Sequence, residues 1–323
     1  MLRPSLSIHA SAFGTLLLVG ALGASARDLV RFEHLTIDSG LSQNDVTAAL
    51  QNSLGFLWVG TSGGLNRYDG YEFVVFQFDP TDTTSITDNR ITALLETADS
   101  TLWVGTADGL FRYDPDSVAF TANRHNRRNE ATLAFNSIST LHEDASGRIW
   151  IGHADAEDPE VGGISRLDPH SGQAERLAIS SRNEATSAYA FAETPDGTIW
   201  VGTADGLLRY DAAADTFTTL RHDPAEPNSL AGNDVRELFV DSVGRLWVGL
   251  WREGLDCYDP ASGIVDHHKP GPTSIELSSG YLKAHRLLRT QARRVRARSL
   301  TERSRLPEAV ELRALSPRRT HLG

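Results

Sequence analysis

The sequence predicts an all-β fold, a β-propeller built from five four-stranded blades. Two observations carry this prediction: a short segment recurs five times at a nearly constant spacing, and the strand at its centre is apolar on both faces. Its tryptophans lie 45, 47, 50 and 47 residues apart, a period typical of repeat architectures. The tryptophans are Trp58, Trp103, Trp150, Trp200 and Trp247.

The five segments share the pattern of an apolar strand, a glycine-containing turn and a second strand. They are residues 57–69 (LWVGTSGGLNRYD), 102–114 (LWVGTADGLFRYD), 149–168 (IWIGHADAEDPEVGGISRLD), 199–211 (IWVGTADGLLRYD) and 246–259 (LWVGLWREGLDCYD). In the first unit, strands are expected at residues 46–50, 56–61, 65–68 and 73–78. These pieces are too short for helices and are separated by Gly, Asp, Asn and Pro, which is typical of strands joined by hairpins.

The tryptophan strand indicates how the sheets are arranged. Alternate side chains of a strand point to opposite faces, and in Phe56-Leu57-Trp58-Val59 both faces are apolar. Such a strand must be covered on both sides, as in a propeller whose blades pack face to face. The glycine that directly follows the Val or Ile of each tryptophan strand is expected where close packing of sheets leaves no room for a side chain. Those glycines are Gly60, Gly105, Gly152, Gly202 and Gly249.

The repeated core LWVGT-x-x-GL-x-RYD resembles the two-component regulator propeller repeat. Residues 32–46 (FEHLTIDSGLSQNDV) and the linkers at 79–86 (DPTDTTSI) and 223–230 (DPAEPNSL) are also similar to that family. The resemblance implies a periplasmic sensor region, which in relatives precedes a membrane helix and a histidine kinase or another output domain. Relatives often carry enough repeats for two seven-bladed propellers. We therefore expect a truncated member, an incomplete and open seven-bladed propeller. The alternative is that residues 32–36 complete the fifth blade and close a five-bladed ring.

Three differently composed pieces share the chain. Residues 1–26 resemble a signal peptide, with Arg3, an apolar run at 13–23 and the cleavage pattern Ala24-Ser25-Ala26. This predicts a periplasmic protein, with a membrane anchor or a core helix as alternatives. Residues 27–269 hold the repeats, and 270–323 form a basic tail, poorly ordered or frame-shifted, or else a linker or a segment that binds nucleic acid or lipid. The blades are expected near residues 42–80, 88–125, 134–177, 184–222 and 232–269.

The composition of the chain excludes several classes of function and site. The net charge is −11, and a balance of +8 in residues 271–323 leaves −19 for the rest, so the repeats should not bind nucleic acid. A single cysteine excludes an intrachain disulfide and cysteine-based zinc sites. Cys257 stands where the other units have arginine, and we expect it on a semi-exposed strand as an unreactive thiol.

No catalytic constellation, cofactor motif or metal site is found in the sequence. His142-Glu143-Asp144 is interpreted as a strand end rather than a phospho-acceptor motif. Four carboxylates in the third hairpin (Asp155, Glu157, Asp158 and Glu160) offer oxygen ligands for Ca²⁺, but lack EF-hand spacing and favour a solvated loop. The weak candidates for ligand binding are Trp251 and Arg252, because an aromatic flanked by charges can stack on a sugar or on an interface residue. Packing against a neighbouring loop is the alternative.

The leading hypothesis is an extracytoplasmic ligand-sensing propeller without catalysis of its own, or a fragment of one. It would take a small-molecule or glycan ligand near the propeller axis and self-associate through open blade faces. A propeller enzyme such as a glycan hydrolase or lyase, and a partner-binding adaptor, are the alternatives.

Overall fold

The computed structural model describes residues 34–154, 162–179 and 186–268. They form five four-stranded antiparallel sheets within one compact unit, which confirms the predicted all-β architecture of five blades. The predicted signal peptide (1–26), the tail (270–323) and the four carboxylates of the third hairpin lie outside the described residues. Within the described parts, no helix is long and apolar enough to cross a membrane.

Each blade consists of four consecutive strands, and the 3-10 turn η1 (Ile37–Ser39) precedes the first. Blade one contains β1 (Val46–Gln51), β2 (Leu57–Thr61), β3 (Gly64–Tyr68) and β4 (Phe73–Phe76). Blade two contains β5 (Ile91–Glu96), β6 (Leu102–Thr106), β7 (Gly109–Asp114) and β8 (Ala119–Asn123). Blade three contains β9 (Ile138–Glu143), β10 (Ile149–Ala154), β11 (Gly162–Leu167) and β12 (Ala174–Leu177). Blade four contains β13 (Ala188–Glu193), β14 (Ile199–Thr203), β15 (Gly206–Asp211) and β16 (Thr216–Leu220). Blade five contains β17 (Val235–Val240), β18 (Leu246–Leu250), β19 (Gly254–Asp259) and β20 (Ile264–His268).

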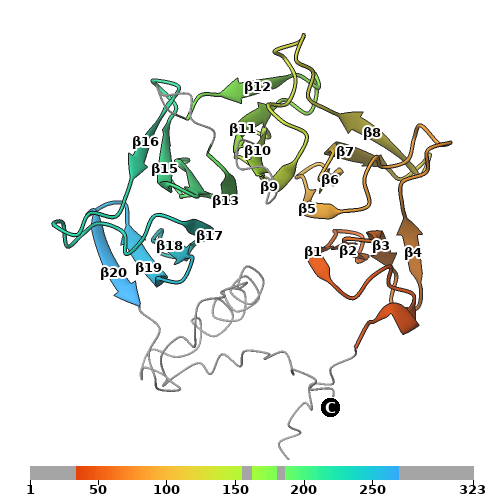
Figure 1. Cartoon of the computed structure of the whole chain (residues 1–323), viewed down its shortest axis with the longest axis horizontal. Helices are drawn as coiled ribbons and strands as arrows, with labels where there is room; N and C mark the ends of the chain where they lie inside the picture. The colour runs from red at the N-terminus through yellow and green to blue at the C-terminus, as the bar shows by residue number, and fades with distance from the viewer. Residues whose placement is uncertain (1–33, 155–161, 180–185, 269–323) are drawn as a thin grey trace, which may run out of the picture. The chain divides into compact units, whose positions relative to one another are not determined.

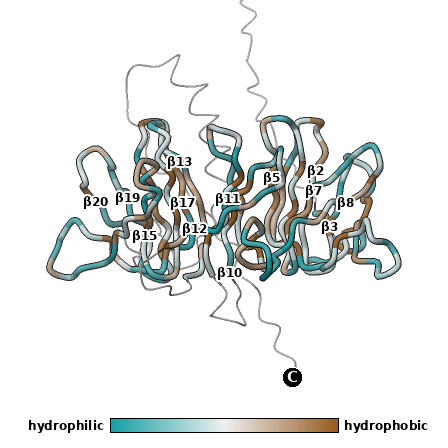
Figure 2. The backbone as a smooth tube through the Cα atoms, turned by 90° about the horizontal axis from the view of Figure 1, so that it is seen from above, coloured by the Kyte–Doolittle hydropathy of each residue, from teal (hydrophilic) through white to brown (hydrophobic). Residues whose placement is uncertain are grey.

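The blades follow one another around an arc, with the first strand of each blade innermost (Figure 1). The inner strands β1, β5, β9, β13 and β17 contact one another in this order. Figure 2 shows apolar segments along the strands and hydrophilic segments in many of the outer loops. The hydrophobic cores lie between blades, since each of the four buried clusters combines residues of two neighbouring blades.

Each of these cores is built around the tryptophan of one blade and the apolar face of the next. Trp58 is 2% exposed and meets Tyr113 of blade two edge-on, with ring centroids 5.1 Å apart. The Trp150–Tyr210 pair repeats this contact at 4.9 Å. Four of the five predicted scaffold tryptophans are buried in this way, which confirms the face-to-face packing inferred from the apolar strands.

The glycines within the tryptophan strands of the first four blades permit this close packing. A Cβ on Gly60 would lie 2.6 Å from Ile91 Cγ2, and one on Gly105 would lie 2.7 Å from Ile138 Cγ2. Both clashes are with the inner strand of the next blade. Glycine is therefore required at these positions by the approach of neighbouring sheets, as predicted.

The fifth blade departs from the prediction at its tryptophan. Trp247 is half-buried rather than buried, and its ring stacks on His268 of its own blade at 5.4 Å. Within the described residues, the far face of this blade has no following blade to cover it. Blade five also supplies all four of its own strands, and residues 34–36 are not a strand, so the described residues do not support the alternative in which the N-terminal segment completes this blade.

Candidate functional site

Every inner strand carries a bulge near its start, where its register against the second strand shifts. In blades one and three the bulged side chain is a short hydroxyl that reaches the next blade. Thr47 Oγ1 donates to the Ile91 carbonyl at 2.5 Å, and Ser139 Oγ donates to the Ala188 carbonyl. The five bulged residues are Thr47, Thr92, Ser139, Tyr189 and Arg236. Blades four and five thus replace a small residue with an aromatic ring and a guanidinium group.

These two large side chains lie against each other. The Arg236 guanidinium carbon stands 3.8 Å from the centre of the Tyr189 ring, a close cation–π contact. Asp234, just before β17, fixes the guanidinium from one edge: its carboxylate accepts from Nε at 2.6 Å and from Nη2 at 2.9 Å. A two-point bond of this kind orients the guanidinium as well as holding it.

Trp251 and Arg252, the residues predicted from sequence, belong to the same cluster. The Trp251 backbone N–H donates to the Asp234 carbonyl at 2.8 Å, which places the β18–β19 hairpin beside the start of β17. Arg236 lies 5.1 Å from the Trp251 ring centre, and Arg252 lies 5.9 Å from it. Trp251 is half-buried and Arg252 exposed.

The hairpin that carries them is one residue longer than its counterparts. In blade five Leu250 pairs with Gly254, whereas in blade two Thr106 pairs with Gly109. The added residue puts Arg252 at φ 73°, a left-handed conformation that few residues other than glycine adopt. Such backbone positions cost free energy and are frequent at binding sites.

Sequence reasoning missed Tyr189, Arg236 and Asp234. The signal that identifies the first two is the second residue of each inner strand, which is Thr, Thr and Ser in the first three blades. That position becomes informative only when the bulge is known, because the bulge turns its side chain toward the next blade. The predicted pair is thus part of a larger cluster of three elements: β13, β17 and the β18–β19 hairpin.

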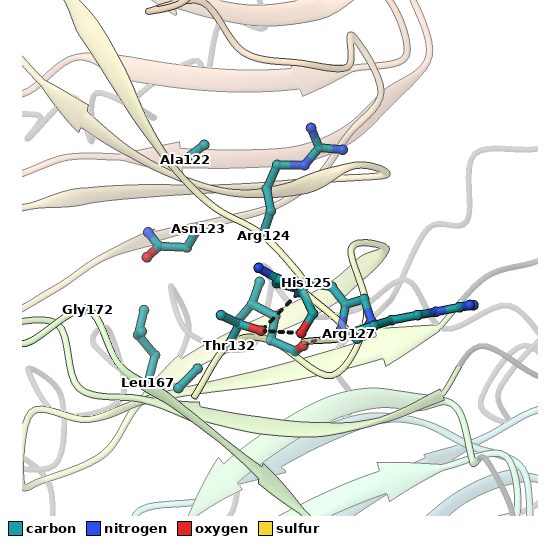
Figure 3. A pocket seen from close by; sticks show the side chains of 11 residues that line it. Ala122, Asn123, Arg124, His125, Arg127, Thr132, Leu167 and Gly172 are labelled. Carbon is teal, nitrogen blue, oxygen red and sulfur yellow. Dashed lines mark hydrogen bonds between the residues drawn. The ribbon is translucent and has the colours of Figure 1, made fainter. Parts of the chain in front are cut away.

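A groove of about 560 Å³ lies elsewhere, where the linker after β8 passes over blade three (Figure 3). Its lining includes Arg124, His125, Arg127, Thr132 and Leu167, and the two arginines point in different directions (Figure 3). His125 Nδ1 donates to the Leu133 carbonyl at 2.7 Å, and the Asn126 backbone N–H donates to Thr132 Oγ1 at 3.0 Å. These bonds close the linker on itself.

The same bonds recur in the linker after blade four. There His222 Nδ1 donates to the Leu230 carbonyl at 2.6 Å, and the Asp223 backbone N–H donates to Ser229 Oγ at 2.9 Å. The Arg124–Asp108 ion pair also has its counterpart in Arg221–Asp205. Polar residues that repeat with the same partners in two blades are accounted for by the scaffold, so the groove is a weaker candidate than the cluster around Arg236.

Other residues singled out from sequence have structural roles. His142 and Glu143 end strand β9 and Asp144 begins the following turn, which confirms the strand-end interpretation. The expectation that Cys257 is semi-exposed was wrong: the residue is 5% exposed, and burial raises the pKa of its thiol. In the described ranges, no group of three or more His, Cys, Asp or Glu side chains is arranged to hold a metal ion.

One buried histidine substitutes for a hairpin residue. In three blades a threonine closes the hairpin after the second strand by donating to a glycine carbonyl, as Thr106 does to Gly109 at 3.0 Å. His153 occupies this place in blade three and is fully buried. Burial, the largest cause, lowers the pKa of His153 to about 4, while the hydrogen bond to the Ser137 carbonyl acts in the opposite direction.

Five four-stranded sheets pack against one another in chain order, and their first strands lie along the same inner side. This arrangement defines a β-propeller repeat protein. A family described as two component regulator propeller matches residues 40–63, 85–108, 132–155 and 184–205. These four matched segments, one in each of the first four blades, are therefore two-component regulator propeller repeats.

Individual relatives agree with this assignment over limited lengths. Histidine kinase P4 of Formosa agariphila is 45% identical over 56 residues, which are 17% of this chain and 4% of that protein. The extracellular domain of a hybrid two-component system from B. thetaiotaomicron superposes with a TM-score of 0.50 at 21% identity, over 77% of this chain and 36% of that one. Virginiamycin B lyase from Staphylococcus aureus superposes with a TM-score of 0.51 at 12% identity, over 72% of each chain. These two structures share the fold with this chain, which spans little more than a third of the first.

Proposed function

We propose that this chain is the ligand-sensing propeller module of a two-component-type signalling system, exported from the cytoplasm and without catalysis of its own. The observation that carries the proposal is the repeat itself, which matches the two-component regulator propeller family at four places. The short match to a histidine kinase supports a signalling context. The role of the chain is then to bind a ligand and pass the change to an output domain.

The cluster of Tyr189, Arg236 and Trp251 supports ligand binding rather than a purely structural role. Polar side chains such as Thr61, Thr106 and Thr203 recur from blade to blade with the same kind of partner, and these three do not. They also come from different elements and meet near the starts of the inner strands, where loops of neighbouring blades converge. In repeat and propeller folds, convergent loops of this kind are the usual place for a ligand.

Export is proposed from the first 26 residues. A charged start, an apolar run and Ala24-Ser25-Ala26 are the three features that a signal peptidase substrate requires. Cleavage after Ala26 would leave a mature chain that begins at Arg27. N-terminal sequencing of protein from the periplasmic fraction tests this, and recovery of the chain from the cytosol with Met1 intact would contradict it.

One experiment distinguishes a ligand-sensing protein from an enzyme. The full chain is screened by thermal shift against metabolites and oligosaccharides, and every compound that raises the melting temperature is then incubated with the protein and analysed for products. We expect stabilisation by at least one compound, because a ligand that binds only the folded state raises its stability. The compound should be recovered unchanged. Conversion of the bound compound would favour the propeller-enzyme alternative, and stabilisation only by a protein partner would favour the adaptor.

A further inference from the structure

The repeats provide an internal test of which residues the fold requires. At the bulge of the inner strand, blades one to three carry Thr47, Thr92 and Ser139, so the blade needs no ring or guanidinium there. At the hairpin position of Trp251, blades two and four carry alanine, and the backbone bond is the same: the Ala204 N–H donates to the Ser187 carbonyl at 3.1 Å. The large side chains of blades four and five are therefore additions to the scaffold.

These additions converge on one place. Tyr189 comes from β13, Arg236 from β17, and Trp251 with Arg252 from the lengthened β18–β19 hairpin. The Arg236 guanidinium joins them, at 3.8 Å from the Tyr189 ring centre and 5.1 Å from that of Trp251. Residues that differ from the repeat in separate elements and yet lie together indicate a common function. Neutral substitutions in the scaffold would instead be scattered over the blades.

We propose that this cluster binds a carboxylate carried on a six-membered ring, an inference that rests on the ligand-sensing function proposed above. Asp234 occupies the Nε and Nη2 edge of Arg236 and thereby directs the remaining Nη1 group away from itself. A guanidinium held in this way is a preorganised donor for a planar anion, since a carboxylate accepts two parallel N–H bonds. Arg252 supplies a second cation beside the same indole.

The aromatic side chains beside Arg236 are the reason for proposing that the ligand carries a ring. Trp251 and Tyr189 are both half-buried aromatic side chains, each with a flat apolar ring. Such side chains bind a flat or ring-shaped body at low cost in conformational entropy. The Tyr189 hydroxyl is a further donor, which again suits a ligand rich in acceptors.

The acidic residue of the lengthened hairpin packs against a neighbouring segment. Glu253, in the same hairpin, packs over Gly232, where an added Cβ would lie 2.8 Å from its Cγ. The charged groups that these contacts place in the cluster are the guanidinium groups of Arg236 and Arg252 and the carboxylate of Asp234.

The test uses the full chain and four probes that separate the anion from the ring. Glucuronate and benzoate carry the carboxylate on a sugar ring and on an aromatic ring, and glucose and benzyl alcohol are their neutral counterparts. Binding is measured by titration calorimetry. We expect at least one acid to bind and its neutral counterpart to bind at least about tenfold more weakly, since charge-assisted hydrogen bonds are the stronger kind. The acid that binds identifies a sugar acid or an aromatic acid as the ligand.

The variants install the residues that other blades already use, so the fold has a precedent for each. Arg236→Thr and Trp251→Ala should each weaken binding of the acid by about 10- to 100-fold, and Tyr189→Thr by less. The matched control is Arg245→Thr. Arg245 also bonds an aspartate, Asp241 at 2.8 Å, and lies over a tryptophan, but beyond the opposite end of β17. This control should bind like the wild type.

Three results would overturn the inference: neither acid binds, a neutral probe binds as tightly as its acid, or Arg236→Thr binds as well as the wild type while circular dichroism shows it folded. If a compound of another class stabilises the protein in the wider screen and these four probes do not bind, the proposed sensing function stands and this ligand assignment fails. If no compound of any class stabilises the protein, the sensing function itself fails.

Discussion

Replacing His153 by threonine should make the stability of the propeller less sensitive to acid. The imidazole is fully buried and is held in its neutral form by two hydrogen bonds. Nδ1 lies 3.2 Å from the Ser137 carbonyl, which only accepts, so the proton is on Nδ1. Nε2 then accepts from the Ser165 hydroxyl at 2.8 Å, and the same hydroxyl accepts from the Ala134 backbone N–H at 2.9 Å. Protonation of Nε2 would disrupt this chain of bonds.

The magnitude follows from the two pKa values. Burial lowers the pKa of His153 from 6.5 to about 4 in the folded state. Between these values the unfolded chain binds a proton that the folded chain excludes, so stability rises with pH. The contribution is fully present above pH 6.5 and is lost progressively as the pH falls toward 4. At about 1.4 kcal/mol for each pH unit, the loss across this window is about 3 kcal/mol.

The assay is the free energy of unfolding in urea at several pH values between 4 and 7. His153→Thr introduces the residue found at this position in three other blades, and the difference in pH slope from the wild type is the quantity of interest. Any constant offset from the smaller side chain cancels in that comparison. Thr203→Val removes the corresponding hydrogen bond in blade four without removing an ionisable group, and it should keep the slope of the wild type. Equal slopes for His153→Thr and the wild type would refute the reasoning.

Three further predictions follow from the packing between blades. Trp150→Phe should cost about 1–2 kcal/mol more than Trp103→Phe, because Trp150 Nε1 donates to Asp144 Oδ2 at 2.8 Å whereas Trp103 Nε1 is buried without a partner. Urea denaturation measures both, and equal losses would contradict a role for that bond. Gly105→Ala should destabilise the protein by about 1–3 kcal/mol, since the new Cβ would be 2.7 Å from Ile138 Cγ2 of the next blade. Gly249→Ala should cost less, because its nearest neighbour, Glu237 of its own blade, is 3.0 Å away; a larger loss at Gly249 in thermal denaturation would argue against the blade contact as the cause. Self-association through end-blade faces such as that of Trp247 should make the sedimentation coefficient rise with protein concentration, and a value independent of concentration would exclude it.

The blades themselves could be derived from the sequence because their determinants are local and repeated. The expected strands at residues 46–50, 56–61, 65–68 and 73–78 differ from β1 to β4 by at most two residues at any end. Alternation within a strand, turn residues between strands and a glycine in each tryptophan strand all act over a few residues. Five copies of the same pattern then reinforced each assignment.

Burial of individual residues depended instead on the neighbouring blade, which no local pattern encodes. Trp247 lies in the same strand pattern as Trp200 (LWVG against IWVG), yet it is half-buried because its outward face has no following blade in the described residues. Cys257 was expected to be semi-exposed by analogy with the arginines of other units. A short side chain at that position stays against the sheet, whereas an arginine extends beyond it, and the thiol is accordingly buried.

The residues of the candidate site also fall into two groups, those that the sequence identifies and those that only the tertiary structure identifies. Trp251 and Arg252 stand out in the sequence because they interrupt a repeated hairpin. Tyr189 lies 62 residues before Trp251, and only the contact between β13 and β17 brings its ring to Arg236 and so to the hairpin. The physical reason is that a propeller joins residues from successive repeats through side-by-side packing of blades. Sequence alone determined which residues depart from the repeat, and tertiary structure decided that they meet.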